Sequence, residues 1–133
     1  APAAIEPSAE PVTGEARPAL DLAAVRQQFD GDLALYGEIL ATTLDEVRAL
    51  RDALAARVDE PGADIVRQIH ALKGVCLNLG FARAGVDAAR LERALRDASL
   101  SPEQLPDALR AYVVVLDEAL DAAARHLAAG PAS

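Results

Sequence analysis

Apolar residues recur along most of the chain at the spacing of an amphipathic helix. The longest such run extends from residue 32 to about residue 58 and contains Tyr36, Leu40, Val47, Leu50 and Leu54. At 100° per residue, these positions lie within about 40° of one line along a helix. The pattern predicts a long helix that buries one face.

A narrower stripe predicts the helix that follows. It consists of Ile65, Ile69, Leu72, Cys76 and Leu79. Pro61 is well placed to open this helix, because a proline in the first turn loses no intrahelical hydrogen bond. Gly80 is the natural end, because glycine readily adopts the left-handed conformation of a C-terminal cap.

Two more helices are expected in the C-terminal half. The first covers about residues 81–97, where small residues would let it approach its neighbours closely. Ser101-Pro102-Glu103-Gln104 combines an N-cap serine, a first-turn proline and a capping-box glutamine, so the last helix is expected to begin there. Its apolar stripe comprises Leu105, Leu109, Tyr112, Leu116, Leu120, Ala123 and Leu127.

These four helices, joined by short connections, predict an all-α fold. The expected architecture is an antiparallel four-helix bundle over residues 20–128. Leu22, Val25 and Phe29 add a short N-terminal helix, which the turn signal Asp30-Gly31 ends.

The two ends of the chain lack the apolar periodicity of the predicted bundle. Residues 1–19 hold four of the eight prolines and show no apolar period, so they are expected to form a disordered Pro/Ala-rich linker. Residues 129–133 are expected to form a flexible C-terminal tail. Because the chain does not begin with Met, we expect it to be a segment of a longer protein.

Composition agrees with a helical domain and excludes several functions. The 133 residues suffice for one domain, and with 3% aromatic residues and no Trp or Met, alanine and leucine must fill the core. A formal net charge of -8 argues against nucleic-acid partners and against a polybasic membrane anchor. No apolar run approaches the length of a membrane span, and the N-terminus lacks the pattern of a signal peptide.

Most catalytic and cofactor sites are also excluded. No zinc or haem spacing is formed by the lone Cys76 and the separated His70 and His126, so the chain is expected to bind no metal or cofactor. A single cysteine cannot form an intramolecular disulfide, and we expect a reducing, cytoplasmic compartment. Cys76 is expected to be a small buried hydrophobe, and His126 to favour the dipole at the end of the last helix. The Gly80 to Gly85 spacing resembles a P-loop, but Val86-Asp87 stands where Lys-Ser/Thr is required, so no nucleotide site is supported.

The candidate chemistry lies in His70-Ala-Leu-Lys73-Gly74. His70 lies about 140° from the core stripe of its helix and should face solvent, with Lys73 and Gly74 beside it on the helix surface. A glycine within a helix costs about 0.5–1 kcal/mol relative to alanine, and here it would give a bulky partner access to the imidazole. Lys73 and Arg67 would supply positive charge to a phosphoryl group. The alternative is an ordinary surface histidine with Gly74 as a packing accommodation.

The surroundings of this motif differ in charge from the rest of the chain. Residues 61–100 contain six basic and four acidic residues, whereas the remainder contains seven basic and seventeen acidic ones. A locally basic face suits an acidic partner. Val66 and Leu77 flank His70 with apolar surface, either as bundle core or as a docking surface.

The run from His70 through Lys73, Gly74, Asn78 and Gly80 closely resembles the signature of histidine-containing phosphotransfer (HPt) domains of bacterial multistep phosphorelays. The resemblance extends from about residue 20 to residue 127. It implies that His70 is phosphorylated, that Lys73 and Gly74 assist, and that Asn78 and Gly80 shape the helix end. By the same resemblance, Glu92 can orient the imidazole. Val75 departs from the pattern, since a small Ser or Ala is usual after the glycine.

The resemblance implies a phosphocarrier. His70 would accept a phosphoryl group from the aspartate of a response-regulator receiver domain and pass it to another receiver, with Mg²⁺ held by the receiver. The chain would have no ATP-binding or kinase activity of its own, would be a monomer in isolation, and would belong to the C-terminal part of a hybrid sensor kinase. The alternative is a non-catalytic helical interaction module that keeps the bundle without phosphotransfer.

Overall fold

The computed structural model describes residues 17–130, and within them every regular element is a helix. The elements are α1 (Leu22–Gln28), α2 (Leu33–Ala55), α3 (Ile65–Asn78), α4 (Ala82–Arg96) and α5 (Leu105–Ala128). The all-helical prediction is therefore confirmed for this part of the chain. None of the described helices is both long and apolar enough to cross a membrane.

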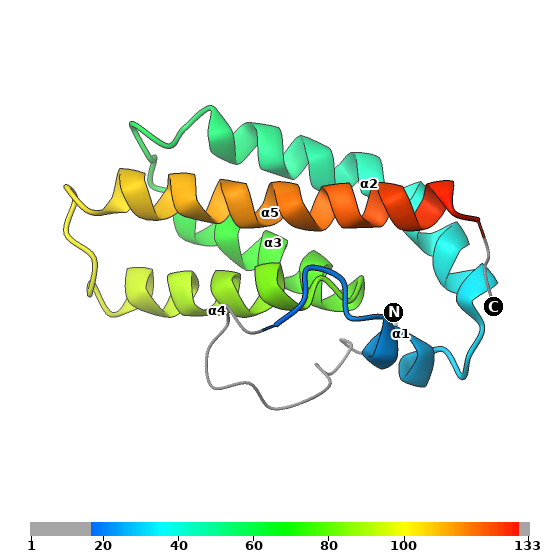
Figure 1. The fold of residues 1–133 in the computed structure, drawn as a ribbon. Helices are drawn as coiled ribbons and strands as arrows, with labels where there is room; N and C mark the ends of the chain where they lie inside the picture. The colour runs from blue at the N-terminus through cyan, green and yellow to red at the C-terminus, as the bar shows by residue number, and fades with distance from the viewer. Residues whose placement is uncertain (1–16, 131–133) are drawn as a thin grey trace.

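The helices form a bundle around one apolar core. In Figure 1, α2, α3, α4 and α5 lie side by side and α1 sits at one end of them. The closest neighbours are α3 and α4, and α2 and α5, while α4 also packs on α5. The largest fully buried side chains come from α2, α3, α5 and the junction before α4, and they include Tyr36, Leu40, Leu54, Ile69, Leu72, Phe81, Leu109 and Leu116.

The core also contains Cys76, as the sequence predicts. Its side chain is fully buried, and its Sγ lies 3.9 Å from the hydroxyl of Tyr112. Burial raises the pKa of the Cys76 thiol to about 12. The thiol is therefore a neutral packing group at physiological pH.

The end of α3 is shaped by Gly80, which adopts a φ of +77°. This conformation lets the N–H of Phe81 donate to the carbonyl of Cys76 at 2.9 Å, the bond that closes a Schellman cap. The Tyr36 hydroxyl donates to the carbonyl of Leu79 and so ties α2 to the same turn. The predicted role of Gly80 as the helix cap is confirmed.

Helix α3 begins later than the sequence predicts. It starts at Ile65, so Pro61 lies in the connection and not in the first turn. The N–H of Ile65 donates to the carbonyl of Gly62 in a tight turn, and the carboxylate of Asp64 pairs with Arg57 at 2.9 Å instead of capping the helix. The connection that contains Pro61, Gly62 and Asp64 therefore reverses the chain between α2 and α3.

Helix α5 also begins later, at Leu105 and not at Ser101. The predicted capping box forms, because the Ser101 N–H donates to Gln104 Oε1 at 2.9 Å and the Gln104 N–H donates to Ser101 Oγ at 3.2 Å. Leu105 completes one helical bond to Ser101. Pro106 has no N–H for the next bond, so the ladder is interrupted after that turn.

The described chain starts against the bundle. The N–H of Arg83 donates to the carbonyl of Pro18 at 3.1 Å, and the N–H of Asp21 donates to the carbonyl of Gly80 at 2.9 Å. Residues 1–16 and 131–133 lie outside the described residues. Most of the predicted linker, residues 1–19, and most of the predicted tail, residues 129–133, therefore remain expectations.

Two helical glycines that look alike in the sequence have opposite surroundings. A Cβ on Gly85 would lie 2.5 Å from Leu77 Cδ2 and 2.9 Å from its Cγ, whereas a Cβ on Gly74 would meet nothing within 4 Å. Gly85 therefore permits the close approach of α4 to α3. This contact also assigns Leu77 to the packing between helices.

We expect Gly85→Ala to lower the free energy of unfolding by about 1–3 kcal/mol, because Leu77 must move to admit the methyl group. The matched substitution Gly74→Ala should leave stability unchanged or raise it by up to about 1 kcal/mol, since alanine is the better helix former. Urea denaturation of both variants measures the difference. Equal effects at the two positions would contradict the packing role of Gly85.

Candidate functional site

His70 projects from the middle of α3 into solvent. Its side chain is 60% exposed, which confirms the orientation predicted from the helical wheel. Its Nδ1 lies 2.9 Å from Glu92 Oε2 on α4. A carboxylate can only accept, so Nδ1 carries the proton, and in the neutral ring Nε2 is the nitrogen with the free lone pair.

Glu92 is the centre of the site. Its side chain is only 7% exposed, and three side chains converge on its two oxygens. Lys73 Nζ lies 2.8 Å from Oε1, while His70 and Arg96 share Oε2, with Arg96 at 2.7 and 3.1 Å through two nitrogens. The site thus joins two residues of α3 to two residues of α4.

The same contacts keep Glu92 ionised. Hydrogen bonds from Lys73 and then from Arg96 lower the pKa of the Glu92 carboxyl to about 2, with a smaller contribution from His70 and against the opposing effect of burial. A carboxylate in this state is a fixed acceptor for the Nδ1 proton. It therefore sets which ring nitrogen faces a reaction partner.

Gly74 leaves the surface beside His70 open. It lies one helical turn after the histidine and is exposed. Outside its own stretch of helix, no atom of residues 17–130 lies within 4 Å of the place where a Cβ would stand. Packing therefore does not require glycine here. The interpretation of Gly74 as a packing accommodation is wrong, and the open surface fits the access expected from the sequence.

The cationic side of the site extends along α4. A hollow of about 300 Å³ is lined by Lys73, Ala89, Glu92, Arg93, Arg96 and Asp97. Three of these side chains are cations, and the single buried carboxylate already accepts from two of them. The three cations outnumber the carboxylates of Glu92 and Asp97, so the hollow is suited to an anionic group.

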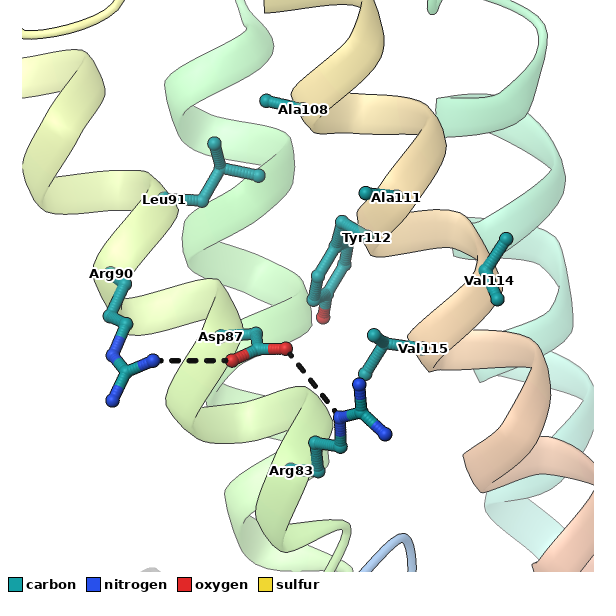
Figure 2. Close-up of a pocket in the computed structure, with 9 residues that line it drawn as sticks. All are labelled: Arg83, Asp87, Arg90, Leu91, Ala108, Ala111, Tyr112, Val114 and Val115. Carbon is teal, nitrogen blue, oxygen red and sulfur yellow. Dashed lines mark ion pairs between the residues drawn. The ribbon is translucent and has the colours of Figure 1, made fainter. Parts of the chain in front are cut away.

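A larger hollow, of about 570 Å³, lies elsewhere, between α4 and α5. Figure 2 shows its apolar lining, which includes Leu91, Val114 and Val115, and the ion pairs from Arg83 and Arg90 to Asp87 at 4.0 and 3.9 Å. Neither His70 nor Glu92 lines it. Residues 17–130 also contain no group of three or more His, Cys, Asp or Glu side chains that could hold a metal ion.

Comparison with known families bears on this geometry. The model of the Hpt domain family matches residues 35–126, which is more than half of the chain. The chain belongs to the Hpt domain family. No curated protein and no solved structure gives a significant match.

Membership of the family connects the helical bundle with histidine phosphotransfer in phosphorelays and with receiver domains as partners. In this HPt domain the matched region runs from α2 into α5 and includes both His70 and Glu92. The short helix α1 precedes it.

The remaining residues suggested by the sequence lie around the site without joining it. Arg67 is exposed and, within residues 17–130, its side chain makes no hydrogen bond or ion pair, so the structure does not bring it to Glu92. Val66 and Val75 are half-buried and pack against the core. Asn78 is the exposed last residue of α3, one turn beyond Gly74.

Arg96 is the site residue that the sequence alone did not single out. It follows Glu92 by four positions on the same helix, a spacing at which a glutamate and an arginine can pair. This spacing was the one feature of the sequence that could have pointed to Arg96. Helical charge pairs are common, however, and only the fold shows that this one contacts the partner of His70.

We expect the pairing of Glu92 to make the HPt domain sensitive to acid. The pKa of Glu92 is about 2 in the folded chain and near its ordinary 4.5 when unfolded, so its contribution to stability is present above that value and is lost as the pH falls toward 2. The difference in unfolding free energy between the wild type and Glu92→Gln should be largest at neutral pH and should shrink over this window. Urea denaturation at a series of pH values measures it.

The control for this experiment is His70→Gln, which leaves Lys73 and Arg96 on Glu92. It should retain most of the acid dependence of the wild type. A constant difference between wild type and Glu92→Gln from pH 7 to pH 2 would contradict the ion-paired state of Glu92.

Proposed function

We propose that this HPt domain is a phosphocarrier in which Nε2 of His70 accepts a phosphoryl group from a receiver aspartate and passes it to another receiver. The observation that carries the proposal is the 2.9 Å contact between His70 Nδ1 and the carboxylate of Glu92. It leaves Nε2 as the nucleophile on an exposed side chain, next to the open surface at Gly74.

The transfer step requires no general base on this chain. Nε2 attacks phosphorus, the new P–N bond forms, and the P–O bond of the aspartyl phosphate breaks as the receiver carboxylate leaves. The proton of the ring stays on Nδ1 throughout. Glu92 stabilises the positive charge that develops on the ring as the P–N bond forms.

The division of labour follows from the charges on the two proteins. Lys73 lies one turn from His70 and can supply one positive charge to the phosphoryl oxygens. We assign Mg²⁺ and the other groups that clamp the phosphoryl group to the receiver domain, and no bound cofactor to this chain. The locally basic surface around His70 favours docking of an acidic partner.

The proposal includes a cellular setting. The helices α2 to α5 form an antiparallel four-helix bundle that acts as a monomeric module at the C-terminal part of a hybrid sensor kinase, in the cytoplasm. The Pro/Ala-rich residues 1–19 support a linker to the parent protein. The receiver domain of that parent is the expected donor or acceptor.

Exchange of phosphate with a receiver domain tests the proposal directly. A receiver encoded in the parent protein or beside its gene is phosphorylated on aspartate, mixed with the domain, and the label is followed in both directions. Label should move to the domain in the presence of Mg²⁺, whereas ATP and Mg²⁺ without a receiver should leave it unlabelled. Self-labelling from ATP would overturn the carrier mechanism.

We expect Lys73→Ala to slow the transfer about ten-fold, the effect of one lost charge-assisted contact, without changing the site of modification. Lys73→Arg should recover part of the rate because the charge is kept. Rapid-quench measurement of the first-order transfer step gives both rates. Chelation of Mg²⁺ should stop transfer in every variant, and an unchanged rate in Lys73→Ala would rule out a role for its charge.

A further inference from the structure

Glu92 has more positive partners than one carboxylate needs. Lys73 occupies Oε1 at 2.8 Å, and Arg96 occupies Oε2 at 2.7 Å, beside the imidazole. One of these cations would be enough to neutralise a single negative charge. The unphosphorylated site therefore does not explain why a second cation binds Glu92.

Phosphorylation of His70 would add negative charge beside Lys73. It places a doubly negative group on the ring, within one helical turn of Lys73. The lysine carries three donors on a flexible stem and already lies against the carboxylate that holds the ring, so it can turn to the phosphoryl oxygens. Such a movement would remove its contact with Oε1 of Glu92.

In the phosphorylated domain, the buried carboxylate of Glu92 would be unstable if no cation remained bound to it. The Glu92 side chain is 7% exposed, and loss of one partner from a buried pair leaves the other charge uncompensated. Arg96 solves this problem because it is anchored on the same helix as Glu92, four residues away, and binds the other oxygen. Its contact does not depend on Lys73 or on the position of α3.

We propose that Arg96 is a positioning residue that holds Glu92 in place while Lys73 moves from Glu92 to the phosphoryl group on His70. The inference rests on the proposed function, because it assigns the moving lysine to the phosphorylated state. In the described residues the Arg96 side chain bonds to Glu92 and makes no hydrogen bond to the imidazole. It acts through Glu92 and frees Lys73 for the reaction.

Arg93 provides a matched control. It lies on the same helix and lines the same hollow, and its substitution removes the same charge. In the described part of the chain its side chain makes no hydrogen bond or ion pair. A general effect of surface charge on docking should appear in Arg93→Ala, whereas an effect through Glu92 should not.

A double-mutant cycle between Lys73 and Arg96 tests the proposal. Transfer rates from one phosphorylated receiver are compared for wild type, Lys73→Ala, Arg96→Ala and the double variant. We expect Arg96→Ala alone to slow transfer about ten-fold, the scale found when a supporting residue of a functional group is removed. In the Arg96→Ala background, the additional substitution Lys73→Ala should have little further effect. Without Arg96, Lys73 stays on Glu92 and does not assist the transfer, so its removal costs little.

The conservative and control variants set the remaining outcomes. Arg96→Lys should restore most of the rate, and Arg93→Ala should leave the effect of Lys73→Ala at its wild-type size. Arg96 is 59% exposed on its side chain, so thermal unfolding should show every variant folded. The proposal is overturned if Lys73→Ala slows transfer by the same factor with and without Arg96, or if Arg93→Ala reproduces Arg96→Ala.

A measurement without phosphate separates this inference from the proposed function. The carboxyl carbon of Glu92 is titrated by NMR between pH 2 and 6. In Lys73→Ala it should still titrate below its ordinary range, because Arg96 remains, and only the double variant should return it to that range. If Lys73→Ala alone has this effect, Arg96 does not hold Glu92, whereas a wild-type domain that takes no label on His70 overturns the proposed function.

Discussion

His70→Gln should abolish labelling of the domain by a phosphorylated receiver, and His126→Gln should be labelled at the wild-type rate. The loss should be complete, because an amide nitrogen is not a nucleophile under these conditions and no other histidine has an exposed, oriented ring. The measurement is transfer of radiolabelled phosphate, followed by separation of the two proteins.

The control works because the two histidines have different surroundings. The ring of His126 lies 5.7 Å from that of Tyr36 at the end of α5, where a cation suits the helix dipole. The ring of His70 is held by Glu92 and is exposed. Substitution of either one removes an imidazole from a folded bundle, so only the position differs.

The chemistry of the label supplies a second check on the same prediction. A phosphoramidate on the imidazole should be lost in acid and survive in base, whereas a serine ester behaves in the opposite way. Label that persists in His70→Gln would refute the assignment. A wild-type domain that binds the receiver and remains unlabelled would instead favour the non-catalytic interaction module.

Gly74→Leu should block phosphotransfer while the bundle still folds. We expect a loss of at least about a hundred-fold, since displacement of reacting groups by about 1 Å can already produce that effect. A leucine at this position would project into the open space beside His70, where a receiver must place its phosphorylated aspartate. Outside its own stretch of α3, the Cβ would meet no atom of the described residues within 4 Å, so folding should be unaffected.

Gly37→Leu is the matched control for Gly74→Leu. Gly37 also lies within a helix and also has no atom within 4 Å of a Cβ, but it belongs to α2 and to a hollow lined by His126. It should transfer phosphate normally, and Gly74→Ala should lose far less activity than the leucine variant. Normal transfer by a folded Gly74→Leu domain would show that access at this position is irrelevant.

The long helices and the outward direction of the His70 side chain could be predicted from the amino-acid sequence alone. Apolar spacing predicted every long helix because the buried face of an amphipathic helix is a local, periodic property. The same periodicity placed His70 on the solvent side, where the structure finds it. Gly80 was recognisable as a cap because glycine adopts a positive φ without the steric cost that a side chain brings.

Local signals were less reliable at the starts of helices. The box of Ser101 and Gln104 forms as predicted, yet α5 begins at Leu105 because Pro106 interrupts the ladder. Pro61 lies before α3, and a tight turn from Gly62 to Ile65 separates the two where the chain reverses between α2 and α3. The capping residue therefore did not decide where either helix starts: Pro106 decided it for α5, and the chain reversal decided it for α3.

The assembly of the site depends on how the helices pack against one another. Glu92 lies 22 positions from His70, and Arg96 is further still, so no local pattern joins them until α3 and α4 pack together. The same packing separates Gly85, pressed against Leu77, from Gly74, which faces open space. Side-chain periodicity records which face of a helix is buried, whereas the partner across the interface depends on the register of two helices and is set by the bundle as a whole.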